Sequence, residues 1–229
     1  MLVSLGFQRF SYDIGLYYSR EREIYILVFV DDIIIIANSE DIDQLKRNLL
    51  KLLNIQQFHD AHYFLEAEII RNREKRTLFL TQEAYADRLL KKHGMEKANS
   101  VATPLSNKLL RKPHPEDVID VESYQSKLGG TQYLAIWTRP DFSFAQSELA
   151  TFATCPAKEH HEAMQHLLRY LKGTKHYGLL FGAEDASMGL LRPYDYSDSD
   201  FARSVMNRKS VSGYVFLVNK ATVFYTFRK

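Results

Sequence analysis

IYILVFV-DD-IIIIA, residues 24–37, is the stretch that decides the fold of the first part of this sequence. Two runs of strand length, rich in β-branched and aromatic residues, flank Asp31 and Asp32. Such runs are typical of buried β-strands, and Asp tolerates the backbone conformations of a tight turn. We therefore predict two buried strands joined as a hairpin, with the two aspartates at its tip.

The Asp31-Asp32 pair is also the sharpest candidate for chemistry. Two adjacent carboxylates repel each other unless a cation or solvent screens their charge. Mg²⁺ would resolve that repulsion, because it accepts carboxylate oxygens and keeps waters for substrate phosphates. Two such ions can activate a hydroxyl and stabilise the leaving oxygen of an in-line displacement. An exposed Asp-Asp turn without metal is the alternative, and the pair alone leaves both interpretations open.

Hydrophobic periodicity outlines the other elements of the first half. The expected elements are a helix at 42–53, strands at 62–70 and 77–80, and a helix at 82–92. We expect Ser39 and Thr81 to cap the two helices and Gly94 to close the second one. The first helix is amphipathic and is expected to pack on the sheet.

The second half is predicted to begin with a linker, which is followed by residues of helical periodicity and then by residues of strand periodicity. Residues 98–120 contain three prolines and few periodic apolar residues, which indicates a linker. Helices are expected at 121–136, 140–151 and 156–172, and the strands of a second sheet at 177–181, 190–196, 212–218 and 222–227. The expected fold class is therefore α+β.

The composition excludes several classes of protein. With 229 residues and 45% apolar residues, the chain is long enough for a sizeable core. Its formal charge of +2 creates no strong electrostatic field that would select a partner. A single cysteine, Cys155, excludes an internal disulfide. The longest apolar stretch is interrupted by Asp31 and Asp32, so it is unsuited to crossing a bilayer. We predict an intracellular chain without a membrane partner, with cytoplasm and nucleus both left open.

The sequence around the aspartate pair resembles a known family. Phe29-Val30-Asp31-Asp32 is similar to the Tyr/Phe-x-Asp-Asp box in the palm of reverse transcriptases. Further blocks resemble the copia-type retrotransposon Pol polyprotein, in its order and over nearly the whole chain: Tyr63–Ile69, Leu80–Tyr85, Leu89-Leu90, Thr103-Pro104, Gly130–Leu134, Thr138–Asp141, His161–Ala163, Leu168–Thr174 and Arg208–Tyr214. One block would be weak evidence, whereas the ordered set is strong.

The resemblance implies a reverse transcriptase joined to a ribonuclease H, which copies RNA into DNA with Mg²⁺. Its partners would be an RNA template, a DNA primer, the RNA–DNA hybrid and deoxynucleoside triphosphates. Asp31 and Asp32 would be metal-binding palm carboxylates, and Asp198 would be the first catalytic, metal-binding carboxylate of the ribonuclease H. The implied regions are 1–103, the rear of the palm with the thumb; 104–186, a linker and helical connection; and 187–229, the first strands of a ribonuclease H-like domain.

Several departures from the family pattern leave the enzymatic activity of this chain open. The first palm aspartate and the fingers of the family lie upstream of the box, and Asp13 matches a different segment. Later ribonuclease H carboxylates are not expected here, and Glu66 stands where the family has a glycine in its primer grip. The alternative is an inactive remnant that at most binds nucleic acid or a polymerase partner. Exposed sheet edges would then favour self-association.

Basic residues between 69 and 92 are the remaining nucleic-acid candidates. This range contains seven basic and three acidic residues, which gives it a local charge of +4. The basic residues are Arg71, Arg73, Lys75, Arg76, Arg88, Lys91 and Lys92. Phosphate contacts need such charges, although a solvated helix face explains them nearly as well. His160, His161 and His166 lack the spacing of a zinc site and are expected to be surface or capping residues.

Overall fold

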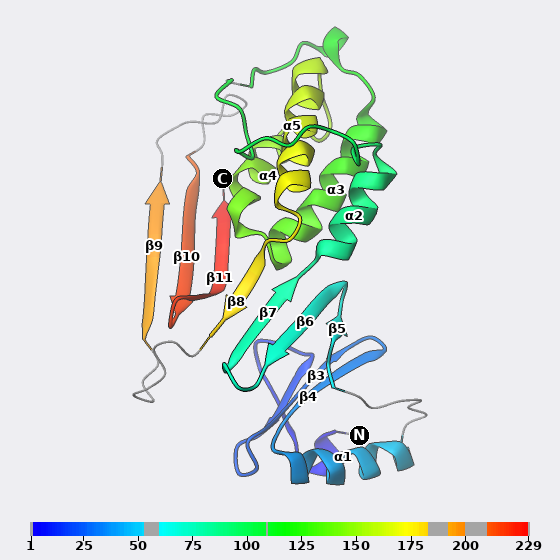
Figure 1. Cartoon of the computed structure of the whole chain (residues 1–229), viewed down its shortest axis with the longest axis vertical. Coiled ribbons are helices and arrows are strands. Elements are labelled where there is room, and N and C mark those ends of the chain that lie inside the picture. The colour runs from blue at the N-terminus through cyan, green and yellow to red at the C-terminus, as the bar shows by residue number, and fades with distance from the viewer. Residues whose placement is uncertain (1, 53–59, 109, 183–191, 200–209, 229) are drawn as a thin grey trace. The chain divides into compact units, whose positions relative to one another are not determined.

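The computed structural model describes residues 2–52, 60–108, 110–182, 192–199 and 210–228 of the chain. The chain divides into two compact units, Met1–Phe64 and Leu65–Lys229. Both contain helix and strand, which confirms the α+β class in its coarse form (Figure 1). In the described part, no helix is long and apolar enough to cross a membrane.

The first unit is an antiparallel sheet with a helix on one face. Its elements are η1 (Val3–Leu5), β1 (Gln8–Arg9), β2 (Leu16–Ser19), β3 (Ile24–Phe29), β4 (Asp32–Ile36), α1 (Ser39–Leu52) and β5 (Tyr63–Phe64). The sheet has the order β1-β2-β3-β4. Ile24 and Ile26 of β3 and Leu45 and Leu49 of α1 are buried in one cluster. The expected packing of this helix on the sheet is therefore confirmed.

Two details of the first unit correct the sequence analysis. The strands of the hairpin were expected to be buried, but Tyr25 and Ile36 are about half or more exposed, at 48% and 62%. The reason is that α1 covers one face of the sheet, so alternate side chains of β3 point away from it. The cap of α1 is Asn38, whose Oδ1 accepts from the Asp41 N–H at 2.9 Å, whereas Ser39 already belongs to the helix.

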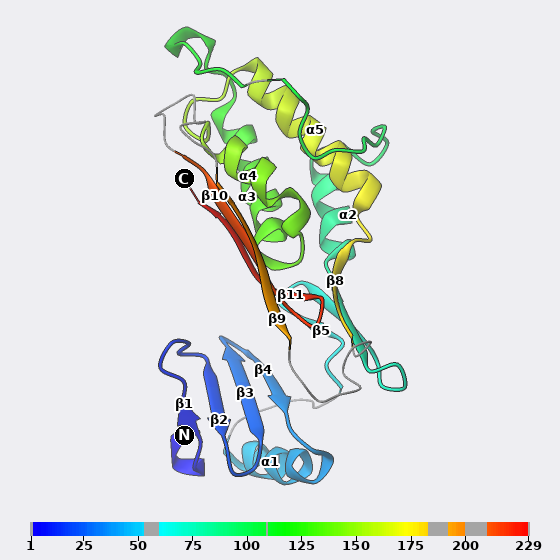
Figure 2. The ribbon, with the colours of Figure 1, turned by 90° about the vertical axis from the view of Figure 1, so that its left-hand side faces the viewer.

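The second unit contains two sheets and four longer helices in its described part. Its elements are β6 (Ala67–Asn72), β7 (Thr77–Thr81), α2 (Glu83–Lys92), η2 (Pro115–Asp117), α3 (Val121–Trp137), η3 (Pro140–Phe142), α4 (Ser143–Ala150), α5 (Lys158–Thr174), β8 (Gly178–Phe181), β9 (Pro193–Ser199), β10 (Ser212–Val218) and β11 (Ala221–Arg228). Within this unit, one sheet has the order β6-β7-β8 and the other the order β11-β10-β9. Figure 2 shows the β9–β11 sheet beside the helices, and β11 contacts α4.

The helices α2 to α5 enclose the larger hydrophobic core. Tyr124, Leu128 and Leu134 of α3 are buried there, and the Tyr124 hydroxyl donates to the Leu149 carbonyl at 2.8 Å. Gly94 closes α2 as expected. Its φ of +66° lies in the left-handed region, and the N–H groups of residues 94 and 95 bond back to carbonyls of the last helical turn.

Three expectations for the second unit are wrong. The strand expected at 62–70 is broken at Leu65 and Glu66, whose φ angles of +47° and +62° make a turn. Thr81 does not cap α2, because it is the buried last residue of β7. The strand expected at 177–181 does not join the later strands. It forms β8, which pairs with β7, where Gly178 lies so close to Leu80 that a Cβ would meet the Leu80 carbonyl oxygen at 2.1 Å.

The described residues of the linker predicted at 98–120 lie along α5, where histidines bond its main chain. His160 is fully buried, and its Nδ1 accepts from the Ala157 N–H at 2.8 Å, so it caps α5. The Nε2 atoms of the three histidines lie 2.9–3.1 Å from three linker carbonyls, those of Thr103 (His166), Arg111 (His160) and Ile119 (His161). The capping role is thus confirmed for His160, which is buried rather than on the surface.

Candidate functional site

The tip of the β3–β4 hairpin holds the predicted metal-binding pair. Phe29 pairs with Asp32, so the two-residue loop consists of Val30 and Asp31. In a symmetric turn the two aspartates would themselves form the loop. Here Asp31 is the second residue of the loop, and Asp32 is the first residue of β4. Both are exposed, and Phe29 and Val30 are exposed beside them. The geometry presents two solvent-accessible carboxylates at one end of a short hairpin.

Val30 has an unusual backbone conformation for its residue type. Its φ is +52°, in the left-handed region, where a β-branched side chain crowds the backbone. The side chain is 83% exposed, so burial of its methyl groups does not offset this strain. Strained conformations of this kind cluster at functional sites, and here the strained residue directly precedes the aspartate pair.

The chemistry of the pair suits Mg²⁺ only in part. Carboxylate oxygens are the ligands that Mg²⁺ prefers, and one or two carboxylates with substrate phosphates often suffice to bind it. In the described residues, however, no three His, Cys, Asp or Glu side chains gather as a metal site. Asp13 stays outside the pair, with its Oδ1 accepting from the Gly15 N–H at 2.9 Å. At the hairpin, the described residues therefore offer two carboxylates and no third His, Cys, Asp or Glu side chain beside them.

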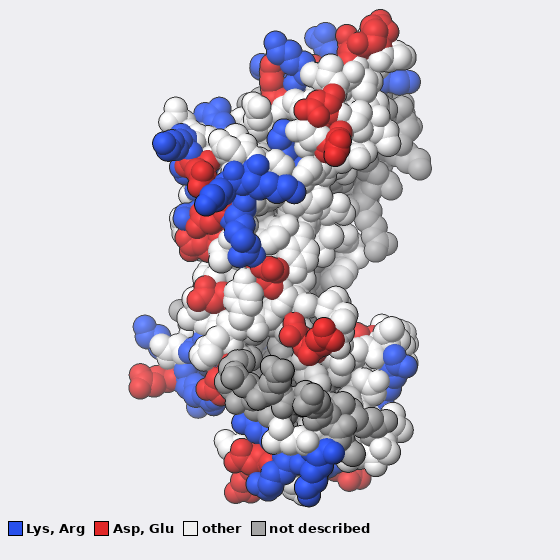
Figure 3. All heavy atoms as spheres, turned by 90° about the vertical axis from the view of Figure 1, so that its right-hand side faces the viewer, with Lys and Arg blue, Asp and Glu red and all other residues white. Residues whose placement is uncertain are grey.

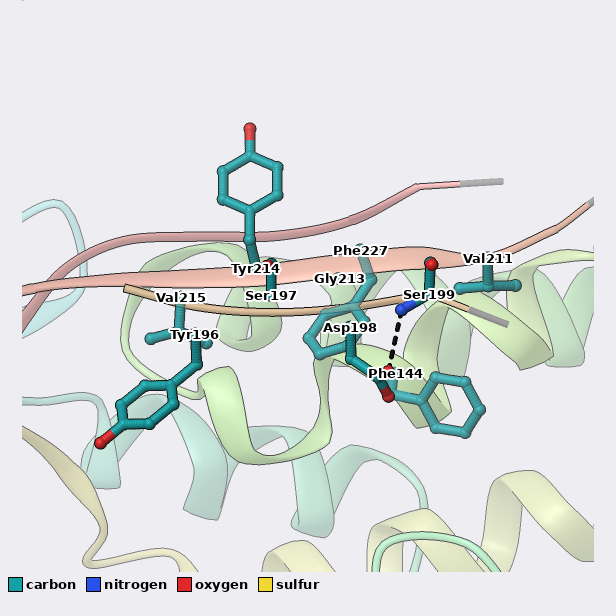
Figure 4. Close-up of a pocket in the computed structure, with 10 residues that line it drawn as sticks. All are labelled: Phe144, Tyr196, Ser197, Asp198, Ser199, Val211, Gly213, Tyr214, Val215 and Phe227. Carbon is teal, nitrogen blue, oxygen red and sulfur yellow. Dashed lines mark hydrogen bonds between the residues drawn. The ribbon is translucent and has the colours of Figure 1, made fainter. Parts of the chain in front are cut away.

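Asp198 lies on β9 and lines a pocket between that strand and α4 (Figure 4). Its Oδ1 accepts from the Ser199 N–H at 2.9 Å. Asp195, three residues earlier on the same strand, pairs with Phe216 and occupies the opposite face of the sheet. Asp195, Asp198 and Asp200 form an acidic cluster in the sequence. In the described part this cluster is divided between two faces of the sheet, and residues 200–209 lie outside that part.

The seven basic residues do not form one patch. Arg71, Arg73, Lys75 and Arg76 are exposed at the β6–β7 turn, while the remaining three belong to α2. Strand β7 leads from that turn to α2 and so separates the groups by its length. Arg88 forms an exposed ion pair with Glu66. On the face that Figure 3 shows, Lys and Arg side chains are interspersed with Asp and Glu.

Two further basic residues, on α5 and directly after it, lie near the basic residues of α2. Lys172 and Lys175 line a hollow of about 360 Å³ together with Arg88 and Lys91 of α2. The Lys175 ammonium lies 3.0 Å from both carboxylate oxygens of Asp87, and this hydrogen bonding raises the pKa of Lys175. Only tertiary structure reveals this grouping, because the two helices lie about 80 residues apart in sequence.

The hairpin with its aspartate pair lies in a part of the chain that matches the reverse transcriptase class. Residues 1–107 match the family described as reverse transcriptase (RNA-dependent DNA polymerase). The chain is 35% identical over 207 residues to the retrovirus-related Pol polyprotein from transposon TNT 1-94 of Nicotiana tabacum, covering 87% of this chain and 15% of that protein. It is 30% identical over 238 residues to the Pol polyprotein from transposon RE1 of Arabidopsis thaliana, covering 100% of this chain and 15% of that protein.

The chain thus belongs to the copia-type retrotransposon Pol family and carries reverse transcriptase sequence. It spans 15–16% of the length of the Pol polyproteins from TNT 1-94, RE1 and RE2. A shorter relative, an uncharacterized mitochondrial protein of Arabidopsis thaliana, is 30% identical over 192 residues, and the match covers 77% of that protein. No solved structure matches the chain.

Proposed function

We propose that this chain contributes part of the polymerase site of a retrotransposon reverse transcriptase, which copies RNA into DNA. The observation that carries the proposal is the exposed Asp31-Asp32 pair on a hairpin inside the matched residues 1–107. Asp31 and Asp32 would bind Mg²⁺ together with the phosphates of an incoming deoxynucleoside triphosphate. When bound, Mg²⁺ supplies neutralisation of phosphate charge and activation of the primer hydroxyl.

In this proposal, buried residues of the first unit hold the aspartate pair in position. The cluster of Ile24 and Ile26 with Leu45 and Leu49 fixes β3 against α1, and β3 carries the tip. Asp32 belongs to β4, and Asp31 precedes it in the two-residue turn, so the sheet holds both close to one end of the hairpin. There both carboxylates would bind the same phosphate group through the metal.

The proposal extends to the rest of the chain. Residues 1–103 would be the rear of the palm and the thumb, 104–186 the helical connection, and 187–229 the start of a ribonuclease H-like domain with Asp198 as its first carboxylate. The template, primer and RNA–DNA hybrid would contact the basic residues of the β6–β7 turn and of α2. The order of the family motifs along the chain supports this assignment.

Metal binding tests the first part of the proposal. Mn²⁺ is a paramagnetic substitute for Mg²⁺, so we expect it to broaden the amide NMR signals of residues 29–33 selectively, and excess Mg²⁺ to reverse the effect. The Asp31→Asn/Asp32→Asn variant should lose the broadening, whereas the control Asp41→Asn/Asp43→Asn on α1 should keep it. Unchanged broadening in the hairpin variant would show that the pair is a turn without metal affinity.

An inactive, nucleic-acid-binding remnant is the second candidate, because the described residues gather only two carboxylates at the hairpin. It would bind RNA–DNA hybrid, an intact polymerase or, through the edge of β9, a second copy. Primer extension on an RNA template with Mg²⁺ separates the candidates. Template-dependent synthesis that disappears in the Asp31→Asn/Asp32→Asn variant supports the enzyme, and salt-sensitive hybrid binding without synthesis supports the remnant.

A further inference from the structure

Arg88 of α2 and Glu66, in the turn before β6, form an ion pair over the ring of Tyr85. Nη2 of Arg88 donates to Oε2 of Glu66, and the guanidinium carbon lies 5.9 Å from the Tyr85 ring centroid. Burial and the Glu66 carboxylate raise the pKa of Tyr85, whereas the Arg88 guanidinium lowers it. The two charges therefore meet beside one aromatic ring.

Contacts with α3 hold this turn and this ring in place. The Tyr133 hydroxyl of α3 donates to the Leu65 carbonyl at 2.6 Å, and the rings of Tyr133 and Tyr85 have centroids 5.1 Å apart. The Tyr85 hydroxyl donates to the Gly130 carbonyl at 3.3 Å. Helix α2 also contacts α3 and β6 (Figure 1). The surroundings of the ion pair are therefore fixed, although its two side chains are long.

The two charged side chains remain accessible to a ligand. Those of Arg88 and Glu66 are 55% and 46% exposed. An ion pair of this exposure contributes little to stability, because water solvates both partners when they separate. A competing anion can therefore replace the Glu66 carboxylate without unfolding the turn.

The Arg88 guanidinium can bind a phosphate in the same way as it binds a carboxylate. Its planar fork donates parallel hydrogen bonds to either anion, and its face stacks on an aromatic ring. Glu66 thus supplies, from within the chain, the kind of anion that a nucleic-acid backbone would offer. Removal of the Glu66 charge would leave the guanidinium on the Tyr85 ring and open to that backbone.

We propose that Arg88, on the Tyr85 ring, is a binding site for a backbone phosphate of the RNA–DNA hybrid, and that the Glu66 carboxylate competes with this phosphate. Binding of the hybrid breaks the ion pair, and Arg88 then bonds to the phosphate instead. Glu66 acts as an internal inhibitor of hybrid binding. The inference rests on the proposed contact between α2 and the hybrid, and it names the residue that weakens this contact.

A double-mutant cycle on hybrid affinity tests the competition. Glu66→Gln keeps the length of the side chain without its charge, so we expect it to strengthen binding of a labelled RNA–DNA hybrid about two- to fivefold at low salt. In an Arg88→Gln background the same substitution should change affinity less than about twofold, because no guanidinium is released. Equal gains with and without Arg88 would overturn the proposal, since repulsion between Glu66 and the hybrid would then explain them.

Glu68→Gln is the charge-matched control for this cycle. It removes an equal charge from an exposed residue of β6, two positions beyond Glu66. We expect it to change affinity less than about twofold, because the carboxylate that bonds to Arg88 stays in place. A gain equal to that of Glu66→Gln would show that net charge, rather than the ion pair, controls affinity.

Pyrophosphate separates the failure of this inference from failure of the proposed function. If wild type and Glu66→Gln both fail to bind the hybrid at low salt, the proposed contact between α2 and nucleic acid is wrong, and pyrophosphate then decides on the site itself. We expect it to shift the ¹⁵N NMR signal of the Arg88 Nε–H, at about two- to fivefold lower concentration in Glu66→Gln. An Arg88 signal that does not respond in either protein, with circular dichroism confirming that both are folded, would contradict a phosphate site.

Discussion

Arg139 and Asp141 form a two-pronged ion pair whose partners differ sharply in exposure. Nε and Nη2 of Arg139 lie 2.8 and 2.7 Å from the two carboxylate oxygens, and the side chains are 1% and 28% exposed. The Tyr170 hydroxyl donates to the same carboxylate at 2.9 Å. Burial and the Asp141 carboxylate raise the pKa of Tyr170 to about 12. Nη2 of Arg139 also donates to the Thr174 hydroxyl at 2.6 Å, so Tyr170 and Thr174 connect the pair at η3 to the end of α5.

The difference in exposure predicts unequal effects of removing each partner. Asp141→Asn leaves a buried guanidinium without its counter-charge, so we expect a loss of about 3–5 kcal/mol in the free energy of unfolding. Arg139→Met leaves a carboxylate that water and Tyr170 can still solvate, so its loss should be smaller. Urea denaturation measures both. Lys175→Gln, in an exposed pair with Asp87, is the control and should cost about 0–1 kcal/mol. Equal losses for Asp141→Asn and Arg139→Met would contradict the argument.

His160 predicts that stability falls as the pH is lowered below about 6.5, its ordinary pKa. Burial lowers the pKa of His160 in the folded chain, and protonation of Nδ1 would break the bond from the Ala157 N–H. Between the two pKa values the unfolded chain binds more protons, so stability decreases with decreasing pH, by up to about 1.4 kcal/mol per pH unit. Glu159 and His161 also face the ring region, with opposite effects on this pKa.

Urea denaturation at pH 7.5, 6.5 and 5.5 checks this expectation. His160→Leu should be less stable at pH 7.5, because it loses two hydrogen bonds, but its stability should vary less between pH 6.5 and 5.5. The difference between the two proteins isolates His160 from the carboxylates. Parallel pH profiles of wild type and variant would show that His160 does not titrate in this range.

Val30→Gly is expected to stabilise the first unit by about 1 kcal/mol, because glycine adopts a positive φ without crowding and the valine side chain is largely exposed. Val28→Gly in β3 is the matched control and should destabilise by about 0.5–1 kcal/mol or more, since it removes packing in a strand. Thermal denaturation of both variants measures these changes in stability. A loss for Val30→Gly similar to that for Val28→Gly would mean that the turn is not strained.

Local patterns predicted most of the elements, because each depends on residues close in sequence. The hairpin, α1 and α3 follow from β-branched runs or helical periodicity. The partner of β8 could not be predicted, since Leu78 and Phe181 are paired across about 100 residues and strand propensity does not specify a partner. The same limit applies to Arg139, whose aromatic neighbours come from separate segments.

The turn at Glu66 offers a conformational reason for the glycine that the family has at this position. The φ angle is +62° there, and glycine adopts such angles most easily. For the acidic cluster, strand alternation alone would have placed Asp195 and Asp198 on opposite faces, had the strand boundaries been known.

The basic residues of the β6–β7 turn are expected to contact the phosphates of a bound RNA–DNA hybrid. Arg71→Gln/Arg73→Gln/Arg76→Gln removes three exposed charges and should weaken RNA–DNA hybrid binding. Each phosphate contact contributes about 0.7–0.9 to the slope of log K against log salt, so three lost contacts should reduce the slope by about 2–3. Filter binding between 50 and 200 mM NaCl measures both quantities. The charge-matched control Lys46→Gln/Arg47→Gln/Lys51→Gln on α1 should change the slope by less than about 1. A similar change in both triple variants would mean that the hybrid responds to net charge, and the turn would then be a solvated surface rather than a phosphate-binding one.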